Sequence, residues 1–296
     1  MRLTRSDRSL LSDWWFTVDR PMLFAVLLLL IGGLVLSLAA SPSVATRLGL
    51  DPFHFFKRHA LLVGPAFLVI VSASMLSTRM IRRASLAIFA IGLVLMVATL
   101  FLGEEIKGAT RWLQFGGISL QPSEFVKPAF VVVCAWLFSE TQAREDVPSL
   151  PLAVTVYVAF VSLLILQPDF GQAFLVTLVW GGLFFLAGLP LIWVGMLGIG
   201  LLMGGMVAYL TVPHVAARID RFINPAAGDT YQTDRAIEAF TNGGWFGTGP
   251  GEGTVKLVLP DAHADFIFAV VAEEFGLVAC LVIVALFGFI VMRAMT

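Results

Sequence analysis

Five ionisable residues stand close together toward the end of the sequence, where a long apolar run begins. Asp261, His263 and Asp265 alternate along one segment, and Glu273 and Glu274 follow about two helical turns later. Partial burial of a carboxylate where water meets hydrocarbon raises its pKa and makes it a better base, so we expect Asp265 to act as a general base. Two other interpretations stay open: a helix N-terminal charge favoured by the dipole, and a metal site, although no partner motif supports the alternate spacing.

A second set of polar residues follows an apolar run in the first half of the sequence. Lys107, Arg111 and Trp112 lie here together. Arg111 is suited to bind a phosphate and Trp112 to stack on a sugar; alternatively, Trp112 only anchors the chain at the membrane interface. Further on, Glu124 and Lys127 are three residues apart and share one helical face. Because ionisable groups at membrane depth are costly, this pair either lines a functional cavity or fixes helix packing.

Polar residues also gather in two connections between apolar runs. In the short connection, Asp169 lies at the membrane rim and either serves a site there or caps the next helix. The long connection, about 213–264, combines glycines, which allow close approach of the backbone to a ligand, with arginines. This combination suits a pyrophosphate or a carboxylate, and a flexible loop without a ligand is the alternative. The residues singled out in the long connection are Arg218, Arg221, Gln232, Gly243 and Gly244.

The composition places the whole chain in the membrane. Of 296 residues, 58% are hydrophobic and 13% are charged, and the mean hydropathy is +0.91. Soluble domains carry about 25% charged residues, so a soluble globule is excluded. The net charge of −1 leaves no basic field for nucleic acid. Cys134 and Cys280 each lie inside an apolar run, which favours packing roles over a disulfide.

The charge-poor stretches predict an all-α fold, a polytopic bundle of transmembrane helices with eight spans. No alternation typical of a membrane barrel is present. The longest stretch is divided at Gly188-Leu189-Pro190, because proline cannot continue a helix. The run at 128–139 becomes long enough only by including Glu124 and Lys127. The stretches are 21–40, 60–78, 84–103, 128–139, 147–168, 170–217 in two helices, and 266–292.

The distribution of basic residues predicts the orientation. Arginines are dense before the first span and in the short connections on its side, which favours a cytoplasmic N-terminus. The sequence is therefore divided into a cytoplasmic segment 1–20, a transmembrane domain 21–293 and a short C-terminal segment 294–296. In this arrangement the two longest connections, about 104–121 and 213–264, both lie on the outer face.

Several of these segments form an ordered series. They are Gly108-Ala109-Thr110-Arg111-Trp112, Gln121-Pro122-Ser123-Glu124 with Lys127, Gln167-Pro168-Asp169, Asn242-Gly243-Gly244 with Gly247 and Gly249, Leu259-Pro260 with His263, Asp265-Phe266-Ile267-Phe268, and Glu273-Glu274-Phe275-Gly276. Each is weak alone, but in this order and spacing they resemble the SEDS family of bacterial membrane proteins (shape, elongation, division and sporulation) across nearly the whole chain. The stretch from Gly243 to Phe268 is more similar to the division branch than to the elongation branch.

The resemblance implies a peptidoglycan glycosyltransferase that polymerises lipid II at the outer face of the cytoplasmic membrane, at the division septum. Its implied partners are a class B penicillin-binding protein, which crosslinks the new strand, and other division proteins. The family's proposed catalytic aspartate corresponds to Asp265 and its groove tryptophan to Trp112. The family usually has ten spans, so we expect that this sequence is truncated at its C-terminus by two helices.

The chemistry implied is an inverting glycosyl transfer in which Asp265 is the base. Lys107, Arg111, Arg218 and Arg221 are candidates to stabilise the leaving pyrophosphate, and a divalent cation is a possible helper without a dedicated motif. Two alternatives remain open: a lipid II flippase and a non-catalytic division scaffold. The full set of expected substrate contacts is Lys107, Arg111, Trp112, Glu124, Lys127, Asp169, Arg218, Arg221, Gln232, Gly243, Gly244, His263 and Glu273.

Overall fold

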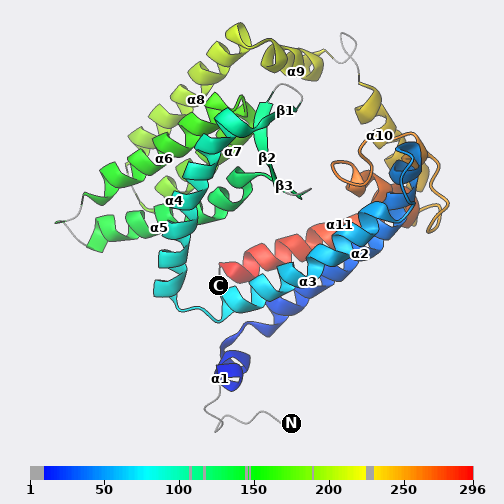
Figure 1. Cartoon of the computed structure of the whole chain (residues 1–296), viewed down its shortest axis with the longest axis horizontal. Helices are drawn as coiled ribbons and strands as arrows, with labels where there is room; N and C mark the ends of the chain where they lie inside the picture. The colour runs from blue at the N-terminus through cyan, green and yellow to red at the C-terminus, as the bar shows by residue number, and fades with distance from the viewer. Residues whose placement is uncertain are drawn as a thin grey trace. The chain divides into compact units, whose positions relative to one another are not determined.

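Most of the chain is helical in the computed structural model, which describes residues 10–106, 109–115, 118–143, 146, 148–188, 190–224 and 230–295. The chain divides into two units. Unit 1 comprises Met1–Met75 and Asp220–Thr296, and unit 2 comprises Leu76–Ile219. The first unit is therefore built from the two ends of the sequence and the second from its middle (Figure 1).

Unit 2 is a helix bundle with an aromatic core. α4 packs against α5 and α6, α5 against α6 and α7, and α7 against α8. Phe130 and Phe160 are almost completely buried, and Trp180 stacks on Tyr157 with ring centroids 4.6 Å apart. The elements are α4 (Thr78–Leu102), β1 (Glu104–Ile106), β2 (Ala109–Phe115), β3 (Ile118–Leu120), α5 (Pro122–Ala143), α6 (Ser149–Leu166), α7 (Phe170–Leu186), α8 (Leu191–Thr211) and α9 (Pro213–Ile223), within which the division between the units falls.

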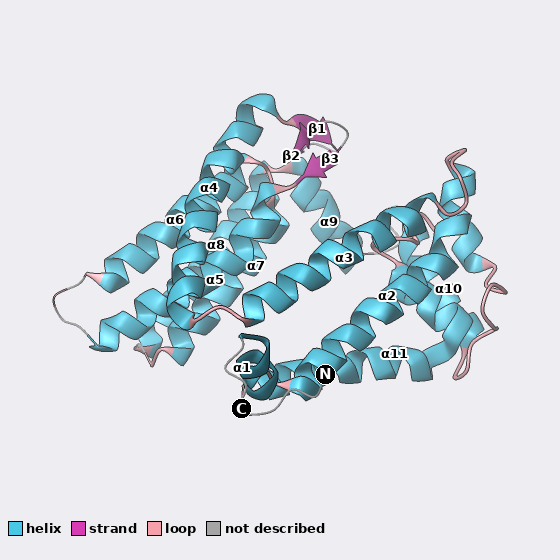
Figure 2. Ribbon diagram, turned by 60° about the horizontal axis from the view of Figure 1, so that its bottom comes forward, coloured by secondary structure: helices cyan, strands magenta, loops and turns pink. Residues whose placement is uncertain are grey.

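A small antiparallel sheet, in the order β1-β2-β3, was not predicted from the sequence. Its register pairs Glu104 with Trp112 and Leu113 with Leu120. The sheet packs through β2 against α4 and α5 (Figure 2), and the Leu113 side chain is buried. These strands are short, but threonine, tryptophan and phenylalanine favour extended backbone on a half-buried surface. The expectation of a plain connection at 104–121 is therefore corrected, although the fold as a whole remains an α-helical bundle.

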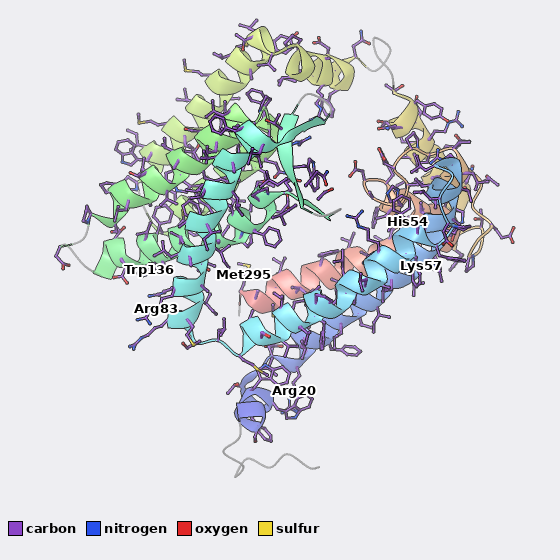
Figure 3. All side chains as sticks on the ribbon, in the orientation of Figure 1. Arg20, His54, Lys57, Arg83, Trp136 and Met295 are labelled. Carbon is purple, nitrogen blue, oxygen red and sulfur yellow. The ribbon has the colours of Figure 1, made fainter. Side chains whose placement is uncertain are left out.

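Unit 1 is built around two long helices. α2 packs against α3 and α11, and α10 packs against α11. The short η2 turn contacts α2, α10 and α11 and contributes Val255 to their core, which also contains Leu259, Ala262 and Ala269. His54 and Lys57 lie in the first turn of α3 (Figure 3). The elements are α1 (Leu10–Thr17), α2 (Arg20–Arg47), α3 (His54–Ser74), α10 (Tyr231–Gly243), η2 (Val255–Leu257) and α11 (Ile267–Ala294).

The backbone of α11 is interrupted at Gly276, where φ is 80° and ψ is 176°. The amide groups that follow this break find partners in the segment after α10: Leu277 N–H donates to the Gly244 carbonyl at 2.9 Å, and Val278 N–H to the Trp245 carbonyl at 3.2 Å. An unpaired backbone group at membrane depth is costly, so irregular backbone persists there only where protein satisfies it. The segment after α10 therefore completes α11.

The predicted pattern of spans agrees closely with the helices. In the described part of the chain, seven helices are long and apolar enough to cross a membrane, and α7, with 17 residues, is a shorter apolar helix. The long apolar stretch divides at the predicted place, since α7 ends at Leu186 and α8 begins at Leu191. One difference is that α3 begins at His54 rather than residue 60. The two cysteines are free and buried, as expected.

Candidate functional site

Asp265 lies on a tight turn that connects η2 to α11. Asp261 has a positive φ of 51°, and its carbonyl accepts the N–H groups of Ala264 at 3.0 Å and Phe266 at 3.3 Å. Arg47 of α2 holds the start of the turn, donating from Nη2 to the Leu259 carbonyl at 2.7 Å. Asp265 itself is exposed. The rest of the protein leaves this residue exposed, directly before the α11 N-cap, Phe266. The expected partial burial of its carboxylate at the membrane surface stays a prediction.

His263, two residues earlier, is packed against an aromatic ring. Its imidazole stacks on Phe55 with ring centroids 4.0 Å apart. Nδ1 is buried and has no hydrogen-bond partner among the described residues. Burial lowers the pKa of His263 below its usual value, while the charges of Asp261 and Asp265 act in the opposite direction. The imidazole is thus mainly neutral at pH 7, and part of its surface is already used in packing.

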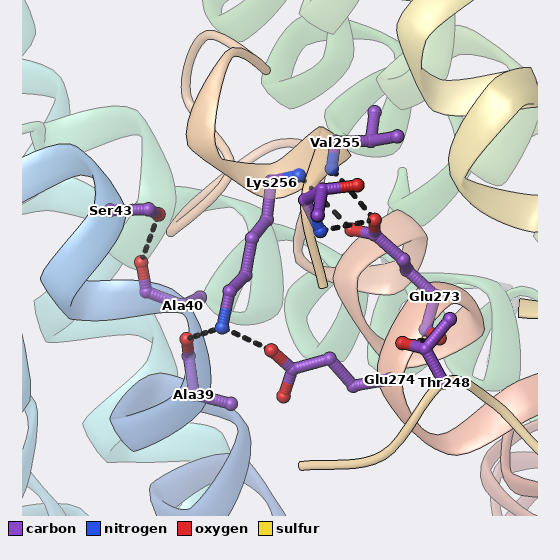
Figure 4. A network of polar contacts seen from close by, with 9 residues as sticks. Ala39, Ala40, Ser43, Thr248, Val255, Lys256, Glu273 and Glu274 are labelled. Atoms are coloured by element: carbon purple, nitrogen blue, oxygen red, sulfur yellow. Dashed lines mark hydrogen bonds and ion pairs between the residues drawn. The ribbon is translucent and has the colours of Figure 1, made fainter. Parts of the chain in front are cut away.

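Glu273 is enclosed by backbone N–H groups rather than facing open space. Oε1 accepts from Thr254 N and Val255 N, both at 2.7 Å, and Oε2 accepts from Lys256 N at 3.0 Å (Figure 4). The residue is 1% exposed. Three N–H donors converging on a carboxylate satisfy a buried negative charge. The expectation that Glu273 binds substrate is therefore not supported by its geometry, since the protein's own backbone occupies the carboxylate.

The neighbouring Glu274 forms a buried ion pair with Lys256. Lys256 Nζ donates to Glu274 Oε1 and also to the Ala39 carbonyl of α2, at 3.2 Å (Figure 4). The side chains of Lys256 and Glu274 are 9% and 0% exposed. Glu274 Oε2 has no partner among the described residues. Lys256, which belongs to η2, thus connects α2 to α11.

The glycines around this cluster are required by contacts within the protein. A Cβ on Gly243 would lie 1.8 Å from the Ala272 carbonyl oxygen, and one on Gly247, where φ is +82°, would lie 2.2 Å from the Glu274 carbonyl oxygen. Neither clash can be relieved by moving a side chain, because both neighbouring atoms belong to the backbone. These glycines therefore bring the segment against α11, not against a ligand as the sequence suggested. Gly244 differs: it has a positive φ, is exposed and has open space around its Cβ position.

A groove within unit 1 runs beside the ion pair. Its volume is about 530 Å³, and it lies between α2 and the segment that contains Pro250 to Leu257. Val35, Leu38 and Phe275 give it apolar walls, while Lys256 and Glu274 contribute to its lining. The groove is therefore largely apolar, with a charged pair in its wall.

Unit 2 holds a second polar cluster, in which side chains pair with one another. Arg111 Nη1 lies 3.1 Å from Asp169 Oδ2, and Asp169 caps α7 by accepting from Gln172 N at 3.5 Å. Lys127 Nζ donates to Glu124 Oε1 at 2.8 Å and to Gln172 Oε1 at 3.0 Å. The cap predicted for Asp169 and the pairing of Glu124 with Lys127 are thus both present. The Nε–H of Arg111 is buried without a partner among the described residues.

The remaining predicted contacts are spread over both units. Trp112 is half-buried on β2 of unit 2. Arg218 is exposed on α9, and Gln232 is exposed on α10 of unit 1. Lys107 and the side chain of Arg221 lie outside the described residues. Among the described residues, no group of three or more His, Cys, Asp or Glu side chains is placed to hold a metal ion.

Sequence reasoning did not single out three residues that the clusters use. Lys256 carried one weak signal, a charged residue between Val255 and Leu257 in a short apolar stretch. Gln172 lies three residues after Asp169, in the first turn of the helix that Asp169 caps. Arg47 ends α2, and nothing in its local sequence indicates that it reaches a carbonyl 212 residues away.

The long apolar helices, with polar clusters at their ends and one helix broken at a glycine, define a polytopic α-helical membrane protein. The chain belongs to the cell cycle protein family that includes FtsW, RodA and SpoVE, since the family model matches residues 20–296. This membership confirms the resemblance indicated by the motifs.

Named relatives agree with this membership. A probable peptidoglycan glycosyltransferase FtsW from Caulobacter vibrioides is 45% identical over 98% of this chain and 75% of its own length. The FtsW of Shewanella sediminis, named in the same way, is 34% identical over 93% of this chain and 69% of its own. In both relatives the similarity extends over most of each chain, and their names support an FtsW-like member of the family.

Solved structures match the fold. A structure described as the coordination of polymerization and crosslinking by a peptidoglycan synthase complex has a TM-score of 0.70 and 25% identity, covering 94% of this chain and 77% of the other. RodA, the rod shape determining protein of Thermus thermophilus, has a TM-score of 0.61 and 23% identity, covering 94% and 74%. The RodA likeness concerns the fold alone.

Proposed function

We propose that this protein is a peptidoglycan glycosyltransferase that polymerises lipid II at the outer face of the bacterial cytoplasmic membrane during septal wall synthesis. The names of the FtsW relatives, one of them 45% identical over nearly the whole chain, support the activity. The single structural observation that carries the proposal is Asp265, an exposed carboxylate on a turn held at both ends.

In the proposed reaction, Asp265 removes the proton from the 4-hydroxyl of the acceptor sugar of a lipid-linked disaccharide. That oxygen attacks the anomeric carbon of a second lipid-linked sugar, and undecaprenyl pyrophosphate leaves with the bonding electrons. One displacement inverts the anomeric centre. None of the described residues hydrogen-bonds the Asp265 carboxylate, so both of its oxygens remain open to a hydroxyl. A positioned base contributes typically about 10²–10⁴-fold.

The rest of the barrier requires stabilisation of the leaving pyrophosphate. Arg111 is the best described candidate for an anionic contact. The Nη1 group of Arg111 forms an ion pair with Asp169, whereas the Nε–H of Arg111 is buried without a partner among the described residues. A phosphate oxygen would satisfy that donor. Arg218, Arg221, Lys107 and a divalent cation stay as predictions from the sequence.

A lipid-linked substrate also needs a place for its hydrocarbon chain. The groove in unit 1 suits such a chain, because Val35 and Leu38 of the apolar helix α2 and Phe275 of α11 form its walls. We propose that this groove accepts part of the prenyl chain.

The proposed setting completes the function. The orientation predicted from the basic residues, with the N-terminus in the cytoplasm, assigns the connections at about 104–121 and 213–264 to the outer face. A crosslinking enzyme of the class B penicillin-binding type is the proposed partner, acting with other division proteins. Support comes from the solved structure described as a synthase complex that coordinates polymerization and crosslinking.

The test is Asp265→Asn in the purified chain with its crosslinking partner, assayed for glycan polymer from lipid II. We expect polymerisation to fall by about 10²-fold or more. Because Asp265 is exposed, the melting temperature should stay near the wild-type value. Glu252→Gln is the matched control: it removes another exposed carboxylate from the same outer segment and should keep full activity. Full activity of folded Asp265→Asn would reject Asp265 as the base.

A further inference from the structure

We propose that Lys256 is a positioning residue that sets the place of the Asp265 turn, a role that rests on the proposed function. Lys256 itself lies nine residues before Asp265. It belongs to η2, the only short turn between α10 and α11 that contacts both of them and α2 in the described part of the chain.

Both ends of Lys256 are bound to α11. Its backbone N–H donates to Glu273 Oε2 at 3.0 Å, and its ammonium group donates to Glu274 Oε1. Consecutive residues on a helix point about 100° apart, so two adjacent carboxylates can hold one lysine from two sides. η2 is thereby fixed in position and in rotation relative to α11.

The same ammonium group ties η2 to α2. Lys256 Nζ donates to the Ala39 carbonyl at 3.2 Å, within the helix whose last residue, Arg47, donates to the Leu259 carbonyl. Lys256 and Arg47 thus hold η2 and the start of the turn to a single helix. Leu259, whose carbonyl accepts the hydrogen bond from Arg47, is completely buried.

Asp265 contributes nothing to its own placement. It is exposed, and its carboxylate makes no hydrogen bond within the described residues. The position of Asp265 is therefore set by the segments on either side of it: η2 with Leu259 before it and α11 after it. A displacement of about 1 Å at a reacting group costs as much as about 10²-fold in rate. Loss of the Lys256 contacts should therefore appear in the chemical step.

A charged anchor in this place has a physical cost that a leucine would not have. Burying an ion pair is often no more stabilising than an apolar pair of the same volume, and in some proteins a buried polar or ionic group instead fixes one arrangement. Lys256 and Glu274 are almost fully buried, and among the described residues the lysine alone binds the Glu274 carboxylate. The pair is therefore suited to define a position rather than to add stability.

The experiment uses the full chain with its crosslinking partner and compares Lys256→Met with the double variant Lys256→Met/Glu274→Met. Lys256→Met leaves Glu274 buried and unpaired, so its melting temperature should fall, and kcat should fall about 10- to 100-fold with KM unchanged. The double variant removes both charges and keeps apolar volume. We expect it to regain the melting temperature but not kcat, and we expect faster amide exchange in residues 258–266 in both variants.

Arg293→Met is the matched control, because it breaks a more exposed ion pair with Asp19 in the same unit. It should leave kcat, KM and exchange of residues 258–266 unchanged. If Lys256→Met does not fold, the kcat of the double variant alone decides whether Lys256 is a positioning residue.

Three results would overturn the positioning role: wild-type kcat in a folded Lys256 variant, full recovery of kcat in the double variant, or a rise of KM alone. Failure of the proposed function is a separate outcome, since the wild-type chain would then make no polymer. In that case amide exchange would still show whether Lys256 holds the turn.

Discussion

The two polar clusters use the same kinds of side chain in opposite ways. In unit 1, Glu273 and Glu274 are each 1% exposed, and backbone N–H groups or Lys256 bind them. In unit 2, Glu124 and Lys127 pair while their side chains stay 48% and 22% exposed. A carboxylate in a membrane protein is therefore not by itself evidence of a substrate contact. Its partners and its remaining exposure decide what it is free to do.

This difference separates structural roles from binding roles. Hydrogen bonds to a buried charge contribute more than exposed ion pairs, because the buried group has no water to replace a lost partner. We therefore expect variants in the unit 1 cluster to change stability first. Variants in the unit 2 cluster should change substrate dependence first.

The largest expected effect tests the comparison directly, with Glu273→Gln against Glu124→Gln. Glutamine at position 273 loses the charge and turns an NH₂ group toward backbone N–H donors. We expect the free energy of unfolding to fall by about 3 kcal/mol or more, since each bond to a charged group contributes about 1.5–3 kcal/mol. Glu124→Gln should cost less than about 1 kcal/mol.

The free energy of unfolding of both variants is measured by denaturing each protein, solubilised in a mild detergent, in the presence of a fluorescent thiol probe. The probe reports unfolding because Cys134 and Cys280 are buried in the folded chain. Equal losses of stability in the two variants would remove the distinction between the clusters.

An intermediate effect is expected for Arg111→Met in unit 2. Methionine leaves Asp169, whose side chain is only 7% exposed, without its ion-pair partner, at a cost of about 1–3 kcal/mol. If Arg111 also binds pyrophosphate, KM for lipid II should rise about tenfold, by analogy with the loss of one charged hydrogen bond. Steady-state polymerisation over a range of lipid II concentrations measures this KM.

Arg82→Met supplies the comparison for Arg111→Met. Arg82 pairs with Glu140 across a longer 3.9 Å and belongs to the same unit. The Arg82→Met variant should keep the wild-type KM for lipid II. A normal KM in folded Arg111→Met would return Arg111 to a purely structural role as the partner of the α7 cap.

The smallest expected effect is the pH dependence of stability through His263. Burial against Phe55 lowers the pKa of His263 in the folded state, so the unfolded chain binds the proton more readily. Stability from this group is therefore complete above the usual histidine pKa and is lost as pH falls through that range. His263→Asn should flatten the fall in melting temperature between about pH 7.5 and pH 5.5. Identical slopes in the two proteins would contradict the burial of a neutral imidazole.

Much of the fold was predictable because the apolar runs match the thickness of a membrane. The break between α7 and α8 followed from Gly188 and Pro190, and Asp169 could be expected to cap a helix because it directly precedes an apolar run. The sheet at Glu104–Leu120 was missed. Its strands are too short for a clear alternation, and pairing between strands rather than local propensity stabilises it.

The candidate site was predictable only in part. Asp265, Arg111 and Lys127 were chosen by type and position, but the exposure of Asp265 toward the rest of the protein could not be predicted, because it depends on how the turn leaves η2. The roles of Gly243 and Gly247 were assigned to a ligand, whereas they allow the chain to lie against α11. Contacts of this kind join residues far apart in sequence and leave no local pattern.

The sequence by itself determined the membrane class, the order of the helices and the ordered motifs that place the chain in its family. These depend on hydrophobicity and on spacing along the chain, both of which are local. Only the tertiary structure decided which charges are satisfied inside the protein and which remain open. That distinction depends on three-dimensional neighbours, as when Lys256 finds Glu274 and Ala39 while Asp265 finds no hydrogen-bond partner among the described residues.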